Sequence, residues 1–202
     1  MCLFMKRAFG LTGGIATGKS TVLEYLQAKV PNLESFDADA SVRALLEKPA
    51  ILAELSEVFG KGIVTPRGDL DRALMREIIF NDPEKRRQLE SVLHPKVRKE
   101  CLEKHAQWLT NDSSTLFVAD VPLLFEVELD FGQDLNLIVA TSEATQRSRL
   151  KIRNHFDDEM ISSILAAQLP IMEKVNRADV VFWNEGPLEV LERQITHFTD
   201  AY

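Results

Sequence analysis

The stretch Gly13-Gly14-Ile15-Ala16-Thr17-Gly18-Lys19-Ser20 decides the fold of this chain. It matches the pattern G-x-x-x-x-G-K-[ST], and its context fits, because an apolar run at 8–11 precedes it and helical spacing follows over 19–29. Glycines let the backbone approach phosphate oxygens closely, and N–H groups at a helix N-terminus form a nest for anions. The stretch therefore predicts a phosphate-binding loop between a buried strand and a helix.

The residues of this phosphate loop, 13–20, have distinct expected roles toward a nucleoside triphosphate. Those expected to bind phosphate oxygens through the backbone are Gly13, Gly14, Ile15, Ala16, Thr17 and Gly18. Lys19 is expected to reach the β- and γ-phosphates, the Ser20 hydroxyl to join the Mg²⁺ shell, and Thr21 to contact the α-phosphate. The alternative is a chance glycine turn capped by Ser20, which the flanking strand and helix disfavour.

The pattern along the chain predicts an α/β fold. Besides the run at 8–11, strand-like runs occur at 33–36, 115–120, 135–140 and 180–183. Helical spacing covers 143–153, 157–175 with a break at Pro170, 188–198, and most of 41–109. Strands alternating with helices imply a parallel sheet covered on both faces. We expect a three-layer sandwich with a five-stranded parallel sheet and a helical insertion.

Length, charge and cysteine content narrow the class of protein. The 202 residues suggest one domain, since domains average about 150 residues. The net charge of -7 argues against nucleic-acid or anionic-membrane partners, which attract basic proteins. Cys2 and Cys101 suit a reducing compartment better than a disulfide scaffold. No apolar run approaches the ~20 residues of a membrane span, and residues 1–7 lack the order of a signal peptide, so we expect a cytoplasmic protein.

Three aspartates at predicted strand ends are candidates for the chemistry beside the phosphates. Asp120 ends an apolar run and is expected to hold Mg²⁺ directly or through water, unless it only forms a turn or a helix cap. Asp37 and Asp39 follow the run at 33–36, and in an extended chain their side chains would share one face. Either could accept a proton from a substrate hydroxyl, or one could cap the next helix.

Basic residues gather in the segment 147–153. Arg147, Arg149, Lys151 and Arg153 alternate there, and in a helix Arg149 and Arg153 share a face. Two guanidinium groups on one face suit the charge of a transferring phosphoryl group, and such segments can close over a nucleotide as a lid. The alternative is a solvated helix flank.

Three residues outside these clusters also need an interpretation. Arg43 and Arg72 are further anion candidates within 41–109, although a surface role is the simpler interpretation of each. His94 precedes Pro95, and we expect it to begin a helix and to have a structural role.

Taken together, these motifs resemble the dephospho-CoA kinase family. The resemblance spans about 8–198 and is carried by Gly10–Ser20, Asp37-Ala-Asp39, Asn81-Asp-Pro83, Leu89-Glu90, Leu93-His-Pro95, Val121-Pro-Leu-Leu-Phe-Glu126, Arg149-x-x-x-Arg153, Ala166-Ala-Gln168, Lys174, Ala178-Asp179 and Asn184-Glu-Gly186. Three positions depart from the family pattern, which often has glycine at Ala16 and aspartate at Asn154 and Trp183. None of these departures removes a residue that phosphate chemistry requires.

The resemblance implies an enzyme that phosphorylates the 3′-hydroxyl of dephospho-CoA with ATP and Mg²⁺. It implies a nucleotide-binding core at 1–40, 110–144 and 178–202, a CoA-binding insertion at 41–109 and a lid at 145–177. Asp39 would be the base, and Lys19 and Arg149 would stabilise the γ-phosphate. Arg153 and Asn184 would bind the nucleotide. The acceptor-binding candidates are Asp37, Arg43, Arg72 and His94.

Two other functions are compatible with a phosphate loop. One is another small-molecule kinase, such as a nucleoside monophosphate kinase, which would share the core and differ in the acceptor pocket. The other is a non-catalytic nucleotide-binding switch. A GTPase switch would carry Asn-Lys-x-Asp and Asp-x-x-Gly, and neither pattern occurs in the sequence.

Overall fold

The structure is a computed structural model that describes residues 6–201, except for the side chain of Asn81. Residues 1–5, which include Cys2, lie outside the described part. The expectation about a signal peptide rests largely on them. The chain forms two compact units, Met1–Phe36 with Lys104–Tyr202, and Asp37–Glu103. Each unit is described by itself below.

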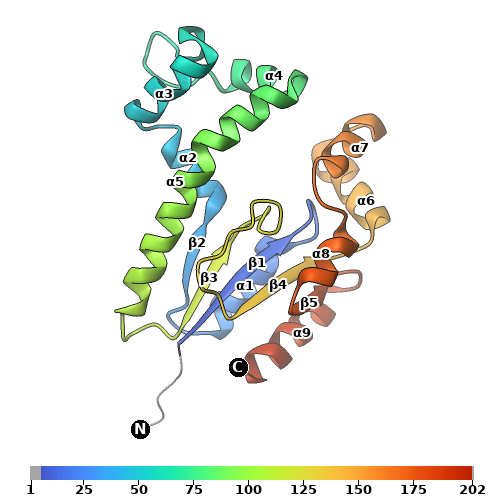
Figure 1. Cartoon of the computed structure of the whole chain (residues 1–202). Coiled ribbons are helices and arrows are strands. Elements are labelled where there is room, and N and C mark those ends of the chain that lie inside the picture. The colour runs from blue at the N-terminus through green and yellow to red at the C-terminus, as the bar shows by residue number, and fades with distance from the viewer. Residues whose placement is uncertain (1–5, 202) are drawn as a thin grey trace. The chain divides into compact units, whose positions relative to one another are not determined.

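A five-stranded sheet organises the first unit (Figure 1). Its strands are β1 (Arg7–Gly13), β2 (Glu34–Asp37), β3 (Leu116–Asp120), β4 (Leu135–Ala140) and β5 (Val180–Trp183), in the order β2-β3-β1-β4-β5. β1 pairs in parallel with β3 and β4, and β4 pairs in parallel with β5. The predicted five-stranded parallel sheet is confirmed. With β1 at its centre, the phosphate loop leaves the middle of the carboxyl edge.

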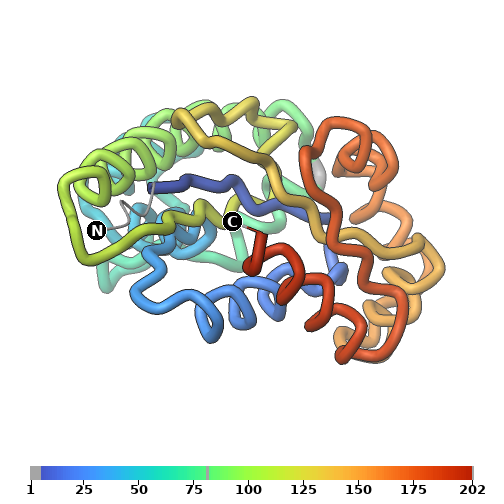
Figure 2. The backbone as a smooth tube through the Cα atoms, turned by 90° about the horizontal axis from the view of Figure 1, so that it is seen from below, coloured from blue at the N-terminus to red at the C-terminus, as the bar shows by residue number. Residues whose placement is uncertain are grey.

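Two helices cover one face of this sheet. They are α1 (Lys19–Lys29) and α9 (Leu188–Ala201), which run side by side in Figure 2. Their buried residues join the inward-facing strand residues in one apolar cluster, whose members include Val22, Leu26, Leu137, Phe182 and Ile195. The predicted helix at 19–29 has these bounds in the structure.

Aromatic residues and a short helix cover the opposite face. The end of α5 (Pro83–Leu109) brings His105 and Trp108 against Phe117 of β3, with Phe131 completing the cluster. Trp108 is 1% exposed, and its Nε1 donates to the Ser114 hydroxyl at 3.1 Å, so it is a packing residue. α8 (Ile171–Arg177) lies along β4. The sheet therefore has helical layers on both faces, as expected for an α/β sandwich.

The second unit contains only helices among its regular elements. They are α2 (Ala38–Leu45), α3 (Pro49–Phe59), the short 3-10 helix η1 (Lys61–Ile63), α4 (Arg72–Asn81) and most of α5. Its buried core includes Leu45, Leu52, Leu55, Ile63 and Val97. The prediction that this part of the chain is mostly helical is confirmed.

One predicted helix boundary was wrong, and one predicted helix break is confirmed. His94 does not begin a helix, because α5 continues through Pro95, and Leu93 and Val97 are both buried one turn apart on its inner side. The predicted helical segment 157–175 with a break at Pro170 is confirmed as two helices. α7 (Asp158–Ala166) ends before a turn, and Pro170 then forms the N-cap of α8.

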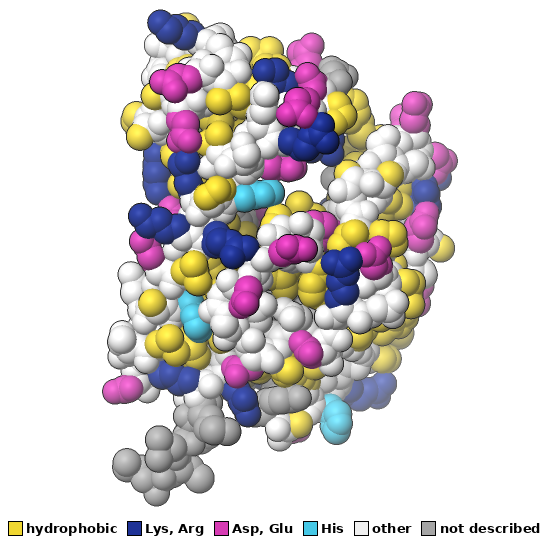
Figure 3. Space-filling view, viewed as in Figure 1, with side chains coloured by type: hydrophobic (Ala, Val, Ile, Leu, Met, Phe, Trp, Pro, Cys, Tyr) yellow, Lys and Arg dark blue, Asp and Glu magenta, His cyan; other side chains and the backbone are white. Residues whose placement is uncertain are grey.

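The surface carries charges of both signs. On the face shown in Figure 3, Lys and Arg side chains are interspersed with Asp and Glu, without a continuous basic surface. Within residues 6–201, no helix combines the length and the apolar character that crossing a membrane requires.

Candidate nucleotide-binding site

The phosphate loop has a tightly turned backbone. Gly18 is the N-cap of α1 with φ +96°, a left-handed conformation that favours glycine. A Cβ at this position would also lie 2.3 Å from Nδ2 of Asn184, so no side chain fits there. Thr17 is fully buried, and its backbone N–H and hydroxyl donate to the Gly14 carbonyl at 3.4 and 2.9 Å. The loop thus reaches the first turn of α1, where N–H groups are available to anions.

Lys19 forms an ion pair with Asp120, which joins the phosphate loop to the end of β3. Asp120 lies beside Leu11 in the β1–β3 register, and both side chains of the ion pair are mostly buried. The structure therefore brings together the predicted phosphate-binding lysine and the predicted metal-binding carboxylate.

The oxygen donors near this ion pair fit Mg²⁺ that arrives with a nucleotide. Ser20 is exposed in the first turn of α1, and Asp120 offers a buried carboxylate. Among the described residues, no group of three His, Cys, Asp or Glu side chains could hold a metal ion by itself. Mg²⁺ commonly takes one or two protein ligands and completes its shell with phosphates and water, which agrees with this donor set.

Arg149 lies on the phosphate loop. α6 (Glu143–Asn154) carries it, and its Nη1 donates to the carbonyls of Ala16 and Thr17 at 3.1 and 3.3 Å. Its Nη2 donates to the carbonyl of Asn184 at 3.0 Å. Asn184 is itself buried, and its Nδ2 donates to the Thr17 carbonyl at 2.8 Å. Two of the predicted nucleotide-binding residues, Arg149 and Asn184, therefore meet at the loop.

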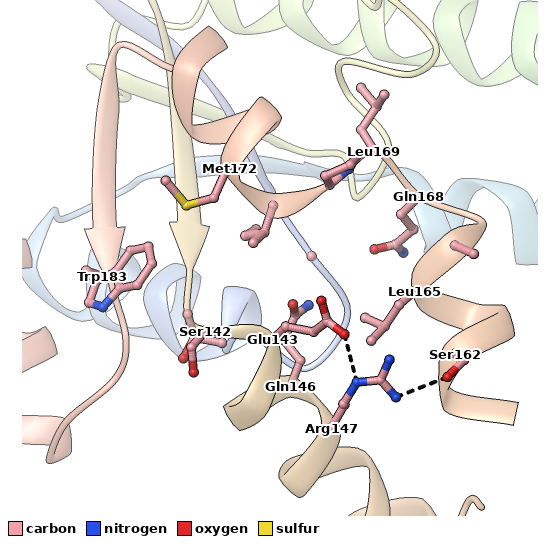
Figure 4. Close-up of a pocket in the computed structure, with 15 residues that line it drawn as sticks. Ser142, Glu143, Gln146, Arg147, Ser162, Leu165, Gln168, Leu169, Met172 and Trp183 are labelled. Carbon is pink, nitrogen blue, oxygen red and sulfur yellow. Dashed lines mark hydrogen bonds and ion pairs between the residues drawn. The ribbon is translucent and has the colours of Figure 1, made fainter. Parts of the chain in front are cut away.

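The other basic residues of α6 have different surroundings. Arg153 is exposed, and its Nε donates to Oδ1 of Asn154 at 3.0 Å. Arg147 donates to Glu143 at 2.8 Å and to the hydroxyl of Ser162 on α7 at 3.1 Å, as Figure 4 shows. Of the predicted basic segment, only Arg149 contacts the loop in this structure.

A pocket of about 700 Å³ opens beside the loop, on the side of α6 that carries Arg147 (Figure 4). Its walls come from the loop, α6, α7, α8 and β5, and include Gly14, Gln146, Gln168, Met172 and Trp183. Trp183 is 38% exposed here, so it is not a core packing residue as Trp108 is.

Glu185 fastens the loop after β5 to the start of α6. Its Oε1 accepts from the hydroxyls of Ser142 and Thr145 at 2.7 and 2.6 Å. Its Oε2 accepts from the Ser142 backbone N–H at 2.7 Å and from the Thr141 hydroxyl at 2.5 Å. The backbone N–H of Ser142, followed by these hydroxyls, lowers the pKa of Glu185 from 4.5 to about 2.

This low pKa predicts a pH-dependent contribution to stability. Because the pKa is lower in the folded chain, the ionised Glu185 stabilises the fold above about pH 4.5, and this contribution is lost as the pH falls toward 2. We expect Glu185→Gln to lower the free energy of unfolding at pH 6 and to lower it by much less at pH 3. Urea unfolding at both pH values measures this. Glu24→Gln, at an exposed position of α1, controls for the lost charge, and an equal deficit at both pH values would contradict the prediction.

A buried ion pair lies behind the same region. Lys174 of α8 is 0% exposed, and its Nζ lies 2.6 Å from Oε1 of Glu126 and donates to the Pro122 carbonyl at 3.3 Å. The same Glu126 oxygen accepts from the backbone N–H of Leu169 at 3.1 Å. The pair therefore ties α8 and the turn before it to the segment that follows β3.

Breaking this pair is expected to destabilise the fold strongly. Lys174→Met leaves the Glu126 carboxylate without its cation, which typically costs about 3–5 kcal/mol of unfolding free energy. Urea unfolding measures the loss. The double variant Lys174→Met with Glu126→Gln should recover part of the stability, because it removes the uncompensated charge. Ordinary surface substitutions change the free energy of unfolding by about 0.5 kcal/mol or less. A change of that size for Lys174→Met would be inconsistent with this expectation.

The predicted acceptor residues lie in the second unit. Asp37 is the N-cap of α2, where its Oδ1 accepts from the Ala40 N–H at 2.9 Å, and Arg43 lies 3.6 Å from its Oδ2. Asp39 follows in the first turn of α2 and is exposed. The helix begins at Ala38, so the two carboxylates do not share one face as they would in an extended chain, and the alternative that one of the two aspartates caps the next helix is confirmed for Asp37.

Arg72 and His94 have separate surroundings within that unit. Arg72 begins α4 and lies 3.8 Å from a carboxylate oxygen of Glu47. Both residues line a cavity of about 250 Å³ with Leu46, Leu52, Asp69 and Leu70. His94 is half-buried within α5 and does not line that cavity.

The sequence patterns predicted no role for five residues that the structure places around the loop. They are Glu126, Gln146, Gln168, Lys174 and Glu185. Four of them belong to the stretches that carry the family resemblance, but the resemblance assigned no role to any of the four. Gln146 had another signal, since it lies one turn before Leu150 on the buried side of α6, where an apolar residue is usual.

Three features together define a P-loop kinase. They are a parallel sheet with this loop after its central strand, a lysine paired with an aspartate at a strand end, and a helix whose arginine contacts the loop. Comparison with known proteins gives the family. A family model described as dephospho-CoA kinase matches residues 7–189. The dephospho-CoA kinase of Bacillus cereus is 38% identical over 194 residues, covering 95% of this chain and 94% of its own length. This chain belongs to the dephospho-CoA kinase family.

Solved structures agree with this assignment. A protein of Thermus thermophilus superposes with a TM-score of 0.79 at 30% identity, and 98% of each chain is covered. The dephospho-CoA kinase of Campylobacter jejuni superposes with a TM-score of 0.64 at 27% identity, covering 98% of this chain and 97% of its own.

Proposed function

We propose that this chain transfers the γ-phosphoryl group of ATP to the ribose 3′-hydroxyl of dephospho-CoA, which gives CoA and ADP. One observation carries the proposal beyond family membership. The ion pair of Lys19 and Asp120 at the carboxyl edge of the sheet supports it, because it joins the residue proposed to bind phosphate to the carboxylate proposed to bind the metal. Nucleotides bind at this edge in open α/β sheets.

The phosphate side of the reaction uses residues of the first unit. The backbone N–H groups of the loop and the first turn of α1, with Thr21, bind the phosphates, and Lys19 turns from Asp120 to the β- and γ-oxygens. Arg149 stabilises the charge of the phosphoryl group from α6, and Arg153 follows it one turn later as a lid residue. Asn184 completes the nucleotide-binding set. Ser20 and Asp120 would hold Mg²⁺, and a bound Mg²⁺ would neutralise part of the negative charge of the phosphates.

The acceptor side uses residues of the second unit. As the new O–P bond forms at the 3′-oxygen and the bond to the β–γ bridging oxygen breaks, Asp39 accepts the hydroxyl proton. The structure supports Asp39 over Asp37, because the Asp37 carboxylate already caps α2 and lies beside Arg43, whereas Asp39 is exposed. Arg43 and Arg72 bind the acceptor's phosphates, with Asp37 and His94 as further acceptor contacts.

The division of labour along the chain follows the same scheme. We propose a nucleotide-binding core at 1–40, 110–144 and 178–202, an acceptor-binding insertion at 41–109 and a lid at 145–177. The reaction is placed in the cytoplasm because a chain with two cysteines suits a reducing compartment. The net charge of -7 supports small-molecule substrates rather than a nucleic-acid or membrane partner.

Product analysis tests this proposal directly. The protein is mixed with Mg·ATP and dephospho-CoA, and the mixture is separated by chromatography with mass detection. CoA and ADP are expected in equal amounts, with no phosphorylation of nucleoside monophosphates offered in parallel. ATP turnover that responds to nucleoside monophosphates but not to dephospho-CoA would support the other small-molecule kinase. Nucleotide binding without any turnover would support the switch.

A further inference from the structure

Two glutamines bind the backbone on either side of the Cα of Ile15 in the phosphate loop, each through a different peptide unit. Nε2 of Gln146 donates to the Ile15 carbonyl at 2.7 Å, and the Ile15 N–H donates to Oε1 of Gln168 at 3.1 Å. The backbone fixes which side-chain atom faces it, because a carbonyl only accepts and an N–H only donates. Gln146 therefore acts as the donor and Gln168 as the acceptor.

The phosphate loop leaves space for the side chain of Gln146. Gln146 is 3% exposed, and a Cβ on Gly14 would lie 2.6 Å from its Nε2. The glycine at position 14 thus leaves the space that the amide occupies. A buried polar group is costly unless it is hydrogen-bonded, so the bond to Ile15 satisfies an amide that could otherwise not be buried there.

The two glutamines come from different parts of the lid region, as Figure 4 shows. Gln146 lies one turn before Arg149 on α6, so this helix binds the carbonyls of Ile15, Ala16 and Thr17 in succession. Gln168 lies in the turn between α7 and α8. The Leu169 N–H next to it donates to Glu126, whose partner is the buried Lys174.

We propose that Gln146 and Gln168 are positioning residues that set the orientations of the two peptide units flanking the Cα of Ile15, and thereby the path of the phosphate loop. The proposal rests on the proposed nucleotide site. The N–H of Ile15 is bonded to Gln168, and loop N–H groups proposed to bind phosphates follow Ile15 directly in the chain, so a rotation of these two peptide units misaligns them. Small misplacements of binding groups reduce rates by up to about 10²-fold. The pair also makes the loop's geometry depend on the position of α6 and of the turn before α8.

The test exploits the opposite polarity of the two bonds. Gln146→Glu places a carboxylate against the Ile15 carbonyl, so we expect kcat/KM for ATP to fall by about tenfold or more. Gln168→Glu keeps an acceptor for the Ile15 N–H, so a loss within about threefold is expected. Gln146→Met and Gln168→Met each remove one bond, and each should lower kcat/KM for ATP by about tenfold. KM for dephospho-CoA should stay within about twofold throughout.

Three controls keep the outcomes distinguishable. Gln107→Glu, at an exposed position of α5, reports the effect of an added charge, and thermal unfolding reports the fold of each variant. Equal losses for Gln146→Glu and Gln168→Glu, or parental kcat/KM in both methionine variants, would overturn the proposal. Lys19→Met is measured alongside, because parental turnover there would instead overturn the nucleotide site on which the proposal rests.

Discussion

Asp39→Asn is expected to lower kcat by about 10²–10⁴-fold, the usual contribution of a general base. The amide is nearly isosteric with the carboxylate but cannot accept the proton of the 3′-hydroxyl. Asp39 is exposed in the first turn of α2, so its replacement leaves no buried group unpaired. ATP binding, measured by calorimetry, should change little because no ATP contact is assigned to Asp39.

Asp37→Asn is the matched control for this prediction. Asparagine caps helices about as well as aspartate, so the N-cap bond to the Ala40 N–H can be kept. We expect kcat to remain within about threefold of the parent, since no proton transfer is assigned to Asp37, while KM for dephospho-CoA rises because Asp37 is a proposed acceptor contact. If instead Asp37→Asn abolished turnover and Asp39→Asn did not, the base would be Asp37.

Lys19→Met is expected to lower kcat/KM for ATP by about 10²–10³-fold, the typical loss when one charge-stabilising donor is removed. In the proposed mechanism, the lysine ammonium interacts with the β- and γ-phosphates in the ground state and with the charge that moves during transfer. Both KM for ATP and kcat should therefore worsen. Steady-state kinetics at varied ATP and saturating dephospho-CoA separate the two effects.

Lys29→Met provides a control on the same helix. Lys29 lies in the last turn of α1, and its Nζ is 3.6 Å from Oε1 of Glu192. Both side chains are partly exposed, and such a surface ion pair contributes about 0–1 kcal/mol to the free energy of unfolding. Its loss should leave both kinetic constants near those of the parent. Phosphoryl transfer by Lys19→Met at the parental rate would remove the loop from the mechanism.

The elements of the first unit could be predicted from sequence because local signals agree there. The glycines of the phosphate loop start α1, Pro31 follows its end, and apolar runs mark the strands. The boundary at His94 was predicted wrongly for a physical reason. A proline often begins a helix, but the burial of Leu93 and Val97 on one side favours a continuous α5.

Site residues could be predicted only where a short sequence motif is typical of one kind of chemistry. Lys19 and Asp120 were predicted in this way, and the structure pairs them. The bonds of Gln146 and Gln168 to Ile15 join residues 131 and 153 positions apart. Periodicity reports whether a side chain is buried but does not identify its partner, so such contacts need the tertiary fold. Glu185 and Lys174 escaped prediction for the same reason.

The left-handed backbone at Ala16 limits how this loop can change in evolution. With φ +60°, any side chain other than glycine carries a steric cost of roughly 1 kcal/mol there, and asparagine or aspartate tolerates the conformation better than most. Side chains branched at Cβ are the least favourable in this conformation. Position 16 therefore favours glycine, alanine and the small polar residues, and Ala16→Gly would relax the backbone while keeping the carbonyl that Arg149 binds.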